Sequence, residues 1–280
     1  VLKYFKIKSQ KRPNLSPWKK ITKITLNTKK SINIAIIGKY VNLKDAYKSL
    51  DEALIHGGIS NKVKVNLIRI ESDNLKSNEI KNRLKNISGL LIPGGFGKRG
   101  TEGKISAIKF ARENKIPFLG ICFGMQMAII EFARNKLKIK KAGSSELDKK
   151  CYPVIGLINE WDKNGKIIKG TDKDLGGTMR LGLYEAKLKN NSAINRIYKA
   201  RLIKERHRHR YEVNNNLKDQ FERKGLIFSG MSPDYKLPEI IELKNHPWFI
   251  GVQFHPEFKS RPLAPHPLFS SFIKAAKNHK

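Results

Sequence analysis

The sequence has few cysteines and no long apolar segment. Its 280 residues contain only two cysteines, Cys122 and Cys151, too few for a disulfide framework. No apolar run reaches the roughly 18 residues that a membrane-spanning helix needs, and the first residues lack the apolar core of a secretory signal. We therefore expect a soluble, cytoplasmic protein with no membrane partner, in which a free thiol can act as a catalyst.

Three common ligand-binding patterns are also missing. No phosphate loop of the form G-x-x-x-x-G-K-[ST] occurs, and no Cys/His cluster has zinc spacing, so we expect neither an ATP site nor a metal site in this chain. The net charge of +33 would suit a polyanion, but the lysines are scattered beside Ile and Asn and no nucleic-acid-binding motif accompanies them. Biased codon usage explains this composition better, so no specific nucleic-acid partner is expected.

The hydrophobic pattern predicts one α/β domain. Residues 1–31 are polar and turn-prone, which indicates a linker, and the chain starts at Val1, so we expect a piece of a longer protein. Short apolar runs then alternate with helical spacing, which favours a central, mostly parallel sheet flanked by helices over 32–276, with a tail at 277–280. The strands are expected at 34–38, 63–70, 89–92, 117–121, 152–157, 177–183, 226–229, 239–243 and 249–253. The helices are expected at 43–57, 77–84, 103–114, 124–135, 192–199 and 267–276.

The segment Gly120-Ile121-Cys122-Phe123-Gly124 joins a buried strand to a helix. Glycine on both sides of Cys122 permits a tight, strained turn that presents the thiol at the carboxyl edge of the sheet, which is the nucleophile-elbow geometry. The start of the following helix favours the thiolate and offers free N–H groups to a developing oxyanion. A buried structural cysteine is the alternative. Cys151 lies in a polar stretch and is expected to be incidental.

His255 and Glu257 follow the last strand. Residues two apart in an extended segment project from the same side, so both can point to the edge where Cys122 emerges. His255 can then accept and return a proton, while Glu257 fixes the imidazole tautomer. Elsewhere, His207 and His209 alternate with arginines in 206–210 and have no metal-binding company, so we interpret that segment as a contact to an anionic ligand or a carboxylate.

Three segments together resemble the signatures of class I glutamine amidotransferase domains: Pro93 to Gly95, Gly120 to Gln126, and His255 to Glu257. Other segments are similar to the C-terminal glutaminase half of the CTP synthase family: 38–49, 94–100, 175–182, 205–214 and 253–257. The resemblance extends from about Asn33 to the end, and 15–18 resembles the linker that follows the synthetase half in that family.

The resemblance implies a role for each matching residue. Cys122 would attack the side-chain amide of L-glutamine, served by His255 and Glu257, and the N–H groups of Gly95 and Phe123 would form the oxyanion hole. The residues implied to bind glutamine are Gly95, Phe123, Gly124, Met125, Gln126, Glu146 and Arg210. Those implied to form a loop associated with GTP activation are Arg99, Gly100 and Glu102.

The resemblance also implies partners. The ammonia would pass to a synthetase (amidoligase) domain that uses ATP and Mg to aminate UTP to CTP, in a homo-oligomer that is a tetramer in the family, with GTP as an activator. This chain would itself hold no cofactor. It departs from the family at Phe123, where Leu is more usual; the N–H is kept, and the expected change lies at the tunnel mouth or in the glutamine pocket.

Three other functions remain to be weighed. The first is the glutaminase domain of another class I amidotransferase, serving guanine, tryptophan or carbamoyl synthesis, against which 175–182 and 206–214 argue. The second is a catalytically dead binding module, against which the intact Cys122, His255 and Glu257 argue. The third is a basic, non-catalytic nucleic-acid binder, for which affinity would fall steeply with salt.

Overall fold

The computed structural model describes residues 2–8, 13–39, 43–73, 75, 78–157, 161–163, 166–168 and 179–279. Its centre is a mixed sheet of nine strands. They are β1 (Ser31–Gly38), β2 (Lys64–Glu71), β3 (Gly89–Ile92), β4 (Phe118–Ile121), β9 (Arg180–Leu188), β10 (Leu202–His209), β12 (Leu226–Met231), β13 (Pro238–Leu243) and β14 (Phe249–Val252). Their order across the sheet is β10-β9-β12-β13-β14-β4-β3-β1-β2.

The sheet changes character at β14. From β2 to β14 every neighbouring pair is parallel, and from β14 to β10 every pair is antiparallel. The inner parallel strands β1, β3, β4 and β14 are largely buried on both faces, which is why they form nearly continuous apolar runs, whereas the edge strand β2 is mostly half-buried or exposed. Two small sheets lie beside this one. Their strands are β5 (Ala142–Ser144), β6 (Tyr152–Leu157) and β11 (Tyr211–Val213), and β7 (Trp161–Lys163) with β8 (Lys166–Ile168).

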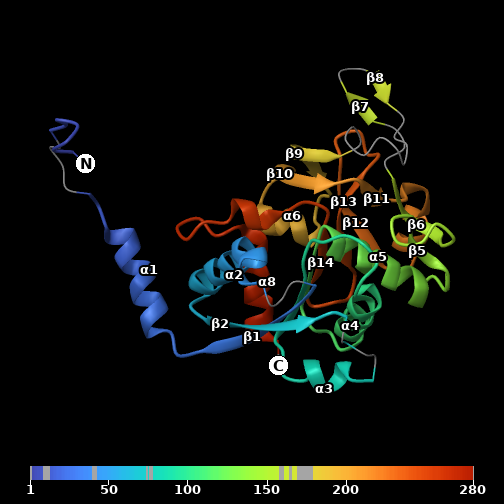
Figure 1. Ribbon diagram of the computed structural model, residues 1–280, viewed down its shortest axis with the longest axis horizontal. Coiled ribbons are helices and arrows are strands. Elements are labelled where there is room, and N and C mark those ends of the chain that lie inside the picture. Colours follow the sequence, from blue (N-terminus) through green and yellow to red (C-terminus); the bar gives the residue numbers. More distant parts are fainter. Residues whose placement is uncertain are drawn as a thin grey trace.

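Helices cover both faces of the large sheet (Figure 1). Helices α4 (Thr101–Glu113) and α5 (Phe123–Asn135) share one apolar cluster with the sheet, while α2 (Lys48–Asn61), α6 (Ala193–Tyr198) and α8 (Pro267–Asn278) share the other. Side chains alternate along β1, so that Ile34 and Ile36 face the second cluster and Ala35 and Ile37 the first. This arrangement confirms the predicted α/β class.

The remaining elements are short or peripheral. They are α1 (Ser16–Asn27), α3 (Ile80–Leu84), α7 (Lys218–Arg223) and the 3-10 turns η1 (Lys44–Tyr47), η2 (Asn215–Leu217) and η3 (Pro256–Lys259). Helix α1 stands apart from the sheet in Figure 1 and buries none of its residues, and the sequence analysis did not predict this helix within 1–31. Within the described ranges, no helix is long and apolar enough to cross a membrane.

Several predicted boundaries were wrong for identifiable reasons. The pair Gly57-Gly58 does not end a helix, because α2 continues to Asn61. A Cβ atom on Gly57 would lie 2.8 Å from the Phe269 carbonyl oxygen of α8, so this glycine serves close helix packing instead. The strand expected at 177–183 is β9, which begins at Arg180, and positions 177 and 178 lie outside the described residues. Residues 206–209 lie in β10 and 211–213 in β11, two strands that the sequence pattern did not predict.

Candidate active site

Cys122 lies at the turn between β4 and α5. Its backbone has φ 51° and ψ −103°, a conformation that side-chain-bearing residues rarely adopt and that costs on the order of 1–3 kcal/mol. The Cys122 N–H donates to the Val252 carbonyl oxygen at 2.7 Å, which fixes the turn against the end of β14. The predicted strained elbow is therefore present, with the thiol at the carboxyl edge of two parallel strands.

The glycines on either side of Cys122 are required by contacts as well as by the turn. A Cβ atom on Gly124 would lie 2.1 Å from the Ile92 carbonyl oxygen, and one on Gly120 would lie 2.8 Å from the Gly124 carbonyl carbon. Helix α5 can therefore begin immediately beside β3 and β4 only if both positions lack a side chain.

We predict that Gly124→Ala lowers the free energy of unfolding by about 3 kcal/mol, because the methyl group can be accommodated only if α5 moves away from β3. Urea unfolding followed by circular dichroism would measure the loss. The matched control is Gly156→Ala, where the added Cβ meets, among the residues that the structure describes, only Ser145 Oγ at 3.9 Å and a small change is expected. Equal losses in the two variants would contradict this account of the elbow.

His255 is held from three sides. Its Nδ1 lies 2.8 Å from Glu257 Oε1, its ring stacks on Phe258 with centroids 5.4 Å apart, and a Cβ on Gly94 would lie 2.7 Å from its Cε1. The pairing with Glu257 was predicted from extended geometry. In the structure neither residue is extended: His255 has φ −112° and ψ 84°, and the 3-10 turn η3 starts at Pro256 and carries Glu257 back toward the ring.

The thiol and the imidazole meet. Burial lowers the pKa of His255, but the side-chain hydrogen bonds to Cys122 and Glu257 outweigh burial and raise this pKa to about 10. Because Nδ1 is engaged by Glu257, Nε2 is the ring nitrogen that is left to interact with the sulfur. A protonated imidazole beside the sulfur stabilises a thiolate, which is the reactive form of cysteine.

Gln253 is a site residue that the sequence analysis did not single out. Its Nε2 lies 3.6 Å from Cys122 Sγ, and its Oε1 accepts from Gln126 Nε2 at 3.3 Å. Gln126 also donates to the Tyr211 carbonyl oxygen at 2.9 Å, so its amide is used within the protein. Gln253 stands two residues before His255, and the same extended spacing that identified Glu257 could have identified it.

The loop of Gly94 to Gly100 begins beside the His255 ring, and its backbone is held by two side chains. The Lys39 ammonium donates to the carbonyl oxygens of Phe96 and Gly97, while the Gly97 N–H donates to Glu146 Oε1 at 2.7 Å. Burial raises the pKa of Glu146, against the opposing effects of this hydrogen bond and of Lys39. Glu146 therefore ties the loop to the segment that follows β5.

The expected oxyanion-hole residues are adjacent. A Cβ on Gly95 would lie 3.9 Å from Phe123 Cδ1, and Phe123 is the first residue of α5, where backbone N–H groups have no partner within the helix. The Phe123 ring is buried, with the ammonium groups of Lys39 and Lys104 each 5.9 Å from its centroid. Burial lowers the pKa of Lys104 to about 8.

The other residues expected to bind glutamine differ in their surroundings. Gly124 and Met125 are buried in the first turn of α5, and Met125 lies in the core. Arg210 lies between β10 and β11, and its Nη1 is buried with no hydrogen-bond partner among the described residues. A buried guanidinium nitrogen without a partner is costly unless a ligand supplies an acceptor.

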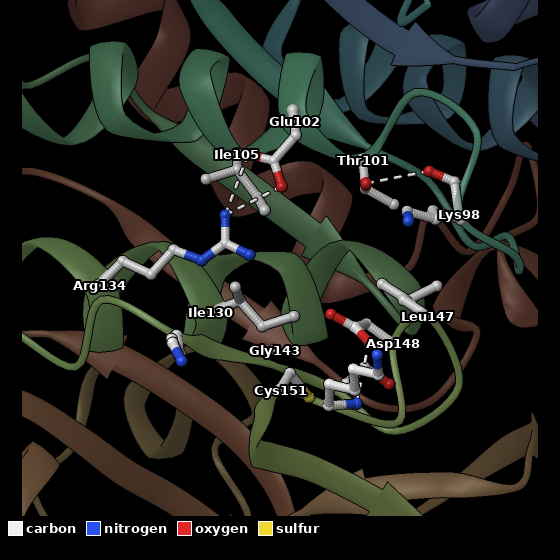
Figure 2. A pocket seen from close by; sticks show the side chains of 13 residues that line it. Lys98, Thr101, Glu102, Ile105, Ile130, Arg134, Gly143, Leu147, Asp148 and Cys151 are labelled. Atoms are coloured by element: carbon white, nitrogen blue, oxygen red, sulfur yellow. Dashed lines mark hydrogen bonds and ion pairs between the residues drawn. The ribbon is translucent and has the colours of Figure 1, made fainter.

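In the loop expected to respond to GTP, the charged side chains form ion pairs within the protein. Arg99 pairs with Asp73 at 2.9 Å, Gly100 has φ 70°, and Glu102 pairs with Arg134 at 2.9 Å. Figure 2 shows the Glu102–Arg134 pair at a cavity of about 420 Å³ that Cys151 also lines. The structure does not bring Cys151 into the site of Cys122.

The histidines of β10 contact carboxyl groups. His207 faces Glu239 at 3.7 Å and His209 faces Glu212 at 3.4 Å, so the carboxylate interpretation of this segment holds within the protein itself. Over the described part of the chain, no group of three or more His, Cys, Asp or Glu side chains is arranged to hold a metal ion.

Comparison with known proteins places this site in a family. The model of the family described as glutamine amidotransferase class-I matches residues 42–275, and the chain belongs to this family. Within it, the chain is 80% identical over all 280 residues to a CTP synthase of Pelagibacter ubique and 55% identical over 279 residues to one of Zymomonas mobilis.

These matches cover 52% and 51% of the two enzymes, so the chain spans about half the length of the curated relatives it matches. Among solved structures, the glutaminase domain of Trypanosoma brucei CTPS with bound acivicin is similar with a TM-score of 0.79 and 32% identity, covering 89% of this chain and 95% of that one. The predicted resemblance to the glutaminase domain of CTP synthase is thereby confirmed.

Proposed function

We propose that this chain hydrolyses L-glutamine through Cys122, His255 and Glu257 and that the ammonia serves the amination of UTP to CTP. One observation carries the proposal: a strained elbow presents the thiol to an imidazole whose far nitrogen is held by a carboxylate. This is the arrangement needed for a thiolate nucleophile with a proton donor beside it. The 80% identity to a CTP synthase favours this purpose over other class I amidotransferase reactions.

The proposed reaction has two steps. The Cys122 thiolate attacks the amide carbon of glutamine, and the N–H groups of Gly95 and Phe123 receive the oxyanion. The His255 imidazolium then gives its proton to the leaving nitrogen, ammonia departs and a glutamyl thioester remains. In the second step His255 takes a proton from water, the hydroxide attacks the thioester, and glutamate is released as the thiolate and imidazolium re-form.

Substrate recognition is assigned to three side chains. Arg210, whose Nη1 is buried and unpartnered, is proposed to bind the glutamine carboxylate in a bidentate manner, for which a guanidinium is suited. Glu146 is proposed to bind the glutamine ammonium group with its second carboxylate oxygen, since its first accepts the Gly97 N–H. Gln126 is proposed to act through Gln253, which it hydrogen-bonds, and so to orient the sulfur.

The proposed partners lie beyond this chain. A synthetase domain that binds ATP and Mg would receive the ammonia, the assembly would be a cytoplasmic homo-oligomer, and GTP would activate the glutaminase at the loop of Arg99, Gly100 and Glu102. The length of the CTP synthase relatives, about twice that of this chain, supports a second functional half.

The experiment is a glutaminase assay of the 280-residue chain alone and with the synthetase half of the Pelagibacter ubique relative, with and without GTP. We expect slow glutamate release from the chain alone and a rise of at least about tenfold when both additions are present, a coupling of roughly 1.4 kcal/mol. Asparagine, one methylene shorter, should not be hydrolysed. Full activity without either addition would contradict the regulatory part, and no glutamate release under any condition would contradict the reaction itself.

A further inference from the structure

Five buried ionisable side chains that the proposed mechanism does not use form a closed ring behind the site. They are Arg180, Glu212, His209, His207 and Glu239, none more than 7% exposed. Arg180 Nη1 lies 3.0 Å from Glu212 Oε1, which lies 3.4 Å from His209 Nδ1. His209 Nε2 lies 2.9 Å from His207 Nδ1. The ring closes through Glu239, whose Oε2 is 3.7 Å from His207 Nε2 and whose Oε1 is 2.7 Å from Arg180 Nη2.

The ring is continuous with the backbone that touches the thiol and the base. Side chains alternate along β10, so His207 and His209 point inward. The carbonyl groups of the arginines between them serve the site: Arg206 accepts the His255 N–H at 2.8 Å, and Arg208 lies 4.0 Å from Cys122 Sγ. The Glu239 carbonyl accepts the N–H of Gln253 at 2.9 Å. The position of β10 and of the Gln253 backbone therefore depends on the ring.

The contact between the two histidines limits where protons can be. Burial and then the charge of Arg180 lower the pKa of both rings far below the ordinary value, so each imidazole is neutral and carries one proton. Only one proton fits between His207 Nδ1 and His209 Nε2. One of the two outer nitrogens must then be bare, and that nitrogen faces a carboxyl oxygen, with which it can hydrogen-bond only if the carboxyl is protonated.

The net charge of the ring also indicates one carboxyl proton. One arginine faces two carboxyl groups, so the ring is neutral only when one carboxyl keeps a proton. Burial raises the pKa of Glu212 to about 8 despite Arg180, with Glu239 adding to the rise. Three other groups face the ring. The Tyr184 ring lies under Arg180, and the charge of Asp234 raises the pKa of Glu239. The charge of His255 lowers the pKa of both His207 and His209.

We propose that this ring holds one proton shared between Glu212 and Glu239 and that its five side chains are positioning residues for Cys122, His255 and Arg210. In the favoured arrangement Glu212 donates to His209 Nδ1, His209 Nε2–H donates to His207 Nδ1, and His207 Nε2–H points to ionised Glu239. Moving one proton along each contact gives the second arrangement, in which Glu239 is protonated and both imidazoles carry the proton on Nδ1. The positioning role rests on the proposed glutaminase function; the proton count does not.

The decisive comparison is between single and double glutamine substitutions. In Glu239→Gln the amide oxygen can keep the contact to Arg180 Nη2 while the amide N–H donates to His207 Nε2, so kcat/KM should fall by no more than about threefold. In the double variant, which adds Glu212→Gln, the charge of Arg180 has no counter-charge, and kcat/KM should fall by at least about 30-fold, with a lower melting temperature. A Glu239→Gln variant as impaired as the double one would overturn the proposal, as would a double variant with wild-type activity.

Two measurements do not depend on glutamine hydrolysis. The imidazole ¹⁵N shifts of the wild-type chain should show both rings neutral and protonated on Nε2 from pH 5 to 7.5; a ring that becomes charged in this range would overturn the proposal. Because the folded pKa of Glu212 is above its unfolded value of about 4.3, its stabilising contribution is lost as pH rises toward 8. Glu239→Gln removes the second carboxyl, whose charge raises this pKa, and should lack the loss, so its melting temperature should rise relative to that of the wild type between pH 6 and 9.

The matched control is Glu131→Gln. Glu131 is also fully buried and accepts from an arginine, Arg112 Nε at 2.9 Å and Nη2 at 2.8 Å, but without a second buried carboxyl to share a proton. This variant should lose stability at all pH values. If Glu239→Gln behaves as Glu131→Gln does, the ring is only an ordinary buried ion pair and the proposal fails, whether or not the chain proves to be a glutaminase.

Discussion

Replacing Cys122 with alanine should lower kcat for glutamine hydrolysis by at least about 10⁴-fold while leaving the fold intact. The thioester route is lost with the sulfur, and no other thiol lies in the site. Alanine fits the space, because it is smaller than cysteine and the Cys122 side chain caps no helix N–H. Glutamate release and thermal unfolding, measured on the same preparation, check the two halves of this expectation.

The control for this variant is Cys151→Ala, which should keep wild-type activity. Burial raises the pKa of Cys151, so its thiol is less ionised than an ordinary cysteine thiol. The residue also lines a cavity (Figure 2) that is separate from the proposed glutamine site. A glutamine-analogue electrophile should accordingly modify Cys122 and spare Cys151. Peptide mapping that places the label on Cys151 would reverse the choice of nucleophile.

Glu257→Gln should have the second-largest effect, lowering kcat by between about 10² and 10⁴-fold. Glutamine keeps a similar shape, but it removes the charge that stabilises the imidazolium and can hold the ring in the wrong tautomer by donating to Nδ1. Glutamate release under saturating glutamine measures kcat. Glu52→Gln, which alters an exposed pair with Lys48 and a 3.9 Å contact with His56, is the control and should keep wild-type activity.

The same substitution should move the alkaline limit of activity. In the wild type the hydrogen bonds of Cys122 and Glu257 raise the pKa of His255 to about 10, so the imidazolium that protonates the leaving nitrogen persists until about that pH. The stabilisation of the fold has the same sign: it is fully present below about pH 6.5, the ordinary histidine pKa, and is lost as pH rises through 10. A profile of kcat/KM from pH 6 to 10.5 should fall at lower pH in the variant; identical profiles would remove Glu257 from the triad.

The parallel half of the fold could be predicted because each strand there is short, apolar and followed by a helix. Strand 89–92 was predicted with both boundaries correct, since burial on both faces leaves a continuous apolar run that ends at Pro93. The antiparallel half of the sheet was harder to predict from the sequence. Strand β10 has the sequence LIKERHRH, in which the buried positions after Ile203 are Glu205, His207 and His209, so its alternation is not one of hydrophobicity.

The candidate site divides in the same way. Cys122, His255 and Glu257 could be predicted because glycine spacing and a two-residue period constrain them locally. The clamp of Lys39 on the Phe96 carbonyl joins segments 57 positions apart, and no local pattern encodes such a contact. The ring of five buried ionisable side chains could not be predicted for a similar reason. Its members come from four strands, and only the tertiary structure brings them into contact.

The order of the central strands has a consequence for how the enzyme is made. Cys122 follows β4, and the base follows β14. These two strands are adjacent in the sheet, although 131 positions separate Cys122 from Gln253, which comes directly after β14. A chain emerging from the ribosome carries its thiol long before the imidazole that would activate it. Unfinished or truncated polypeptides should therefore not hydrolyse glutamine, because the base is present only after β14 has been synthesised.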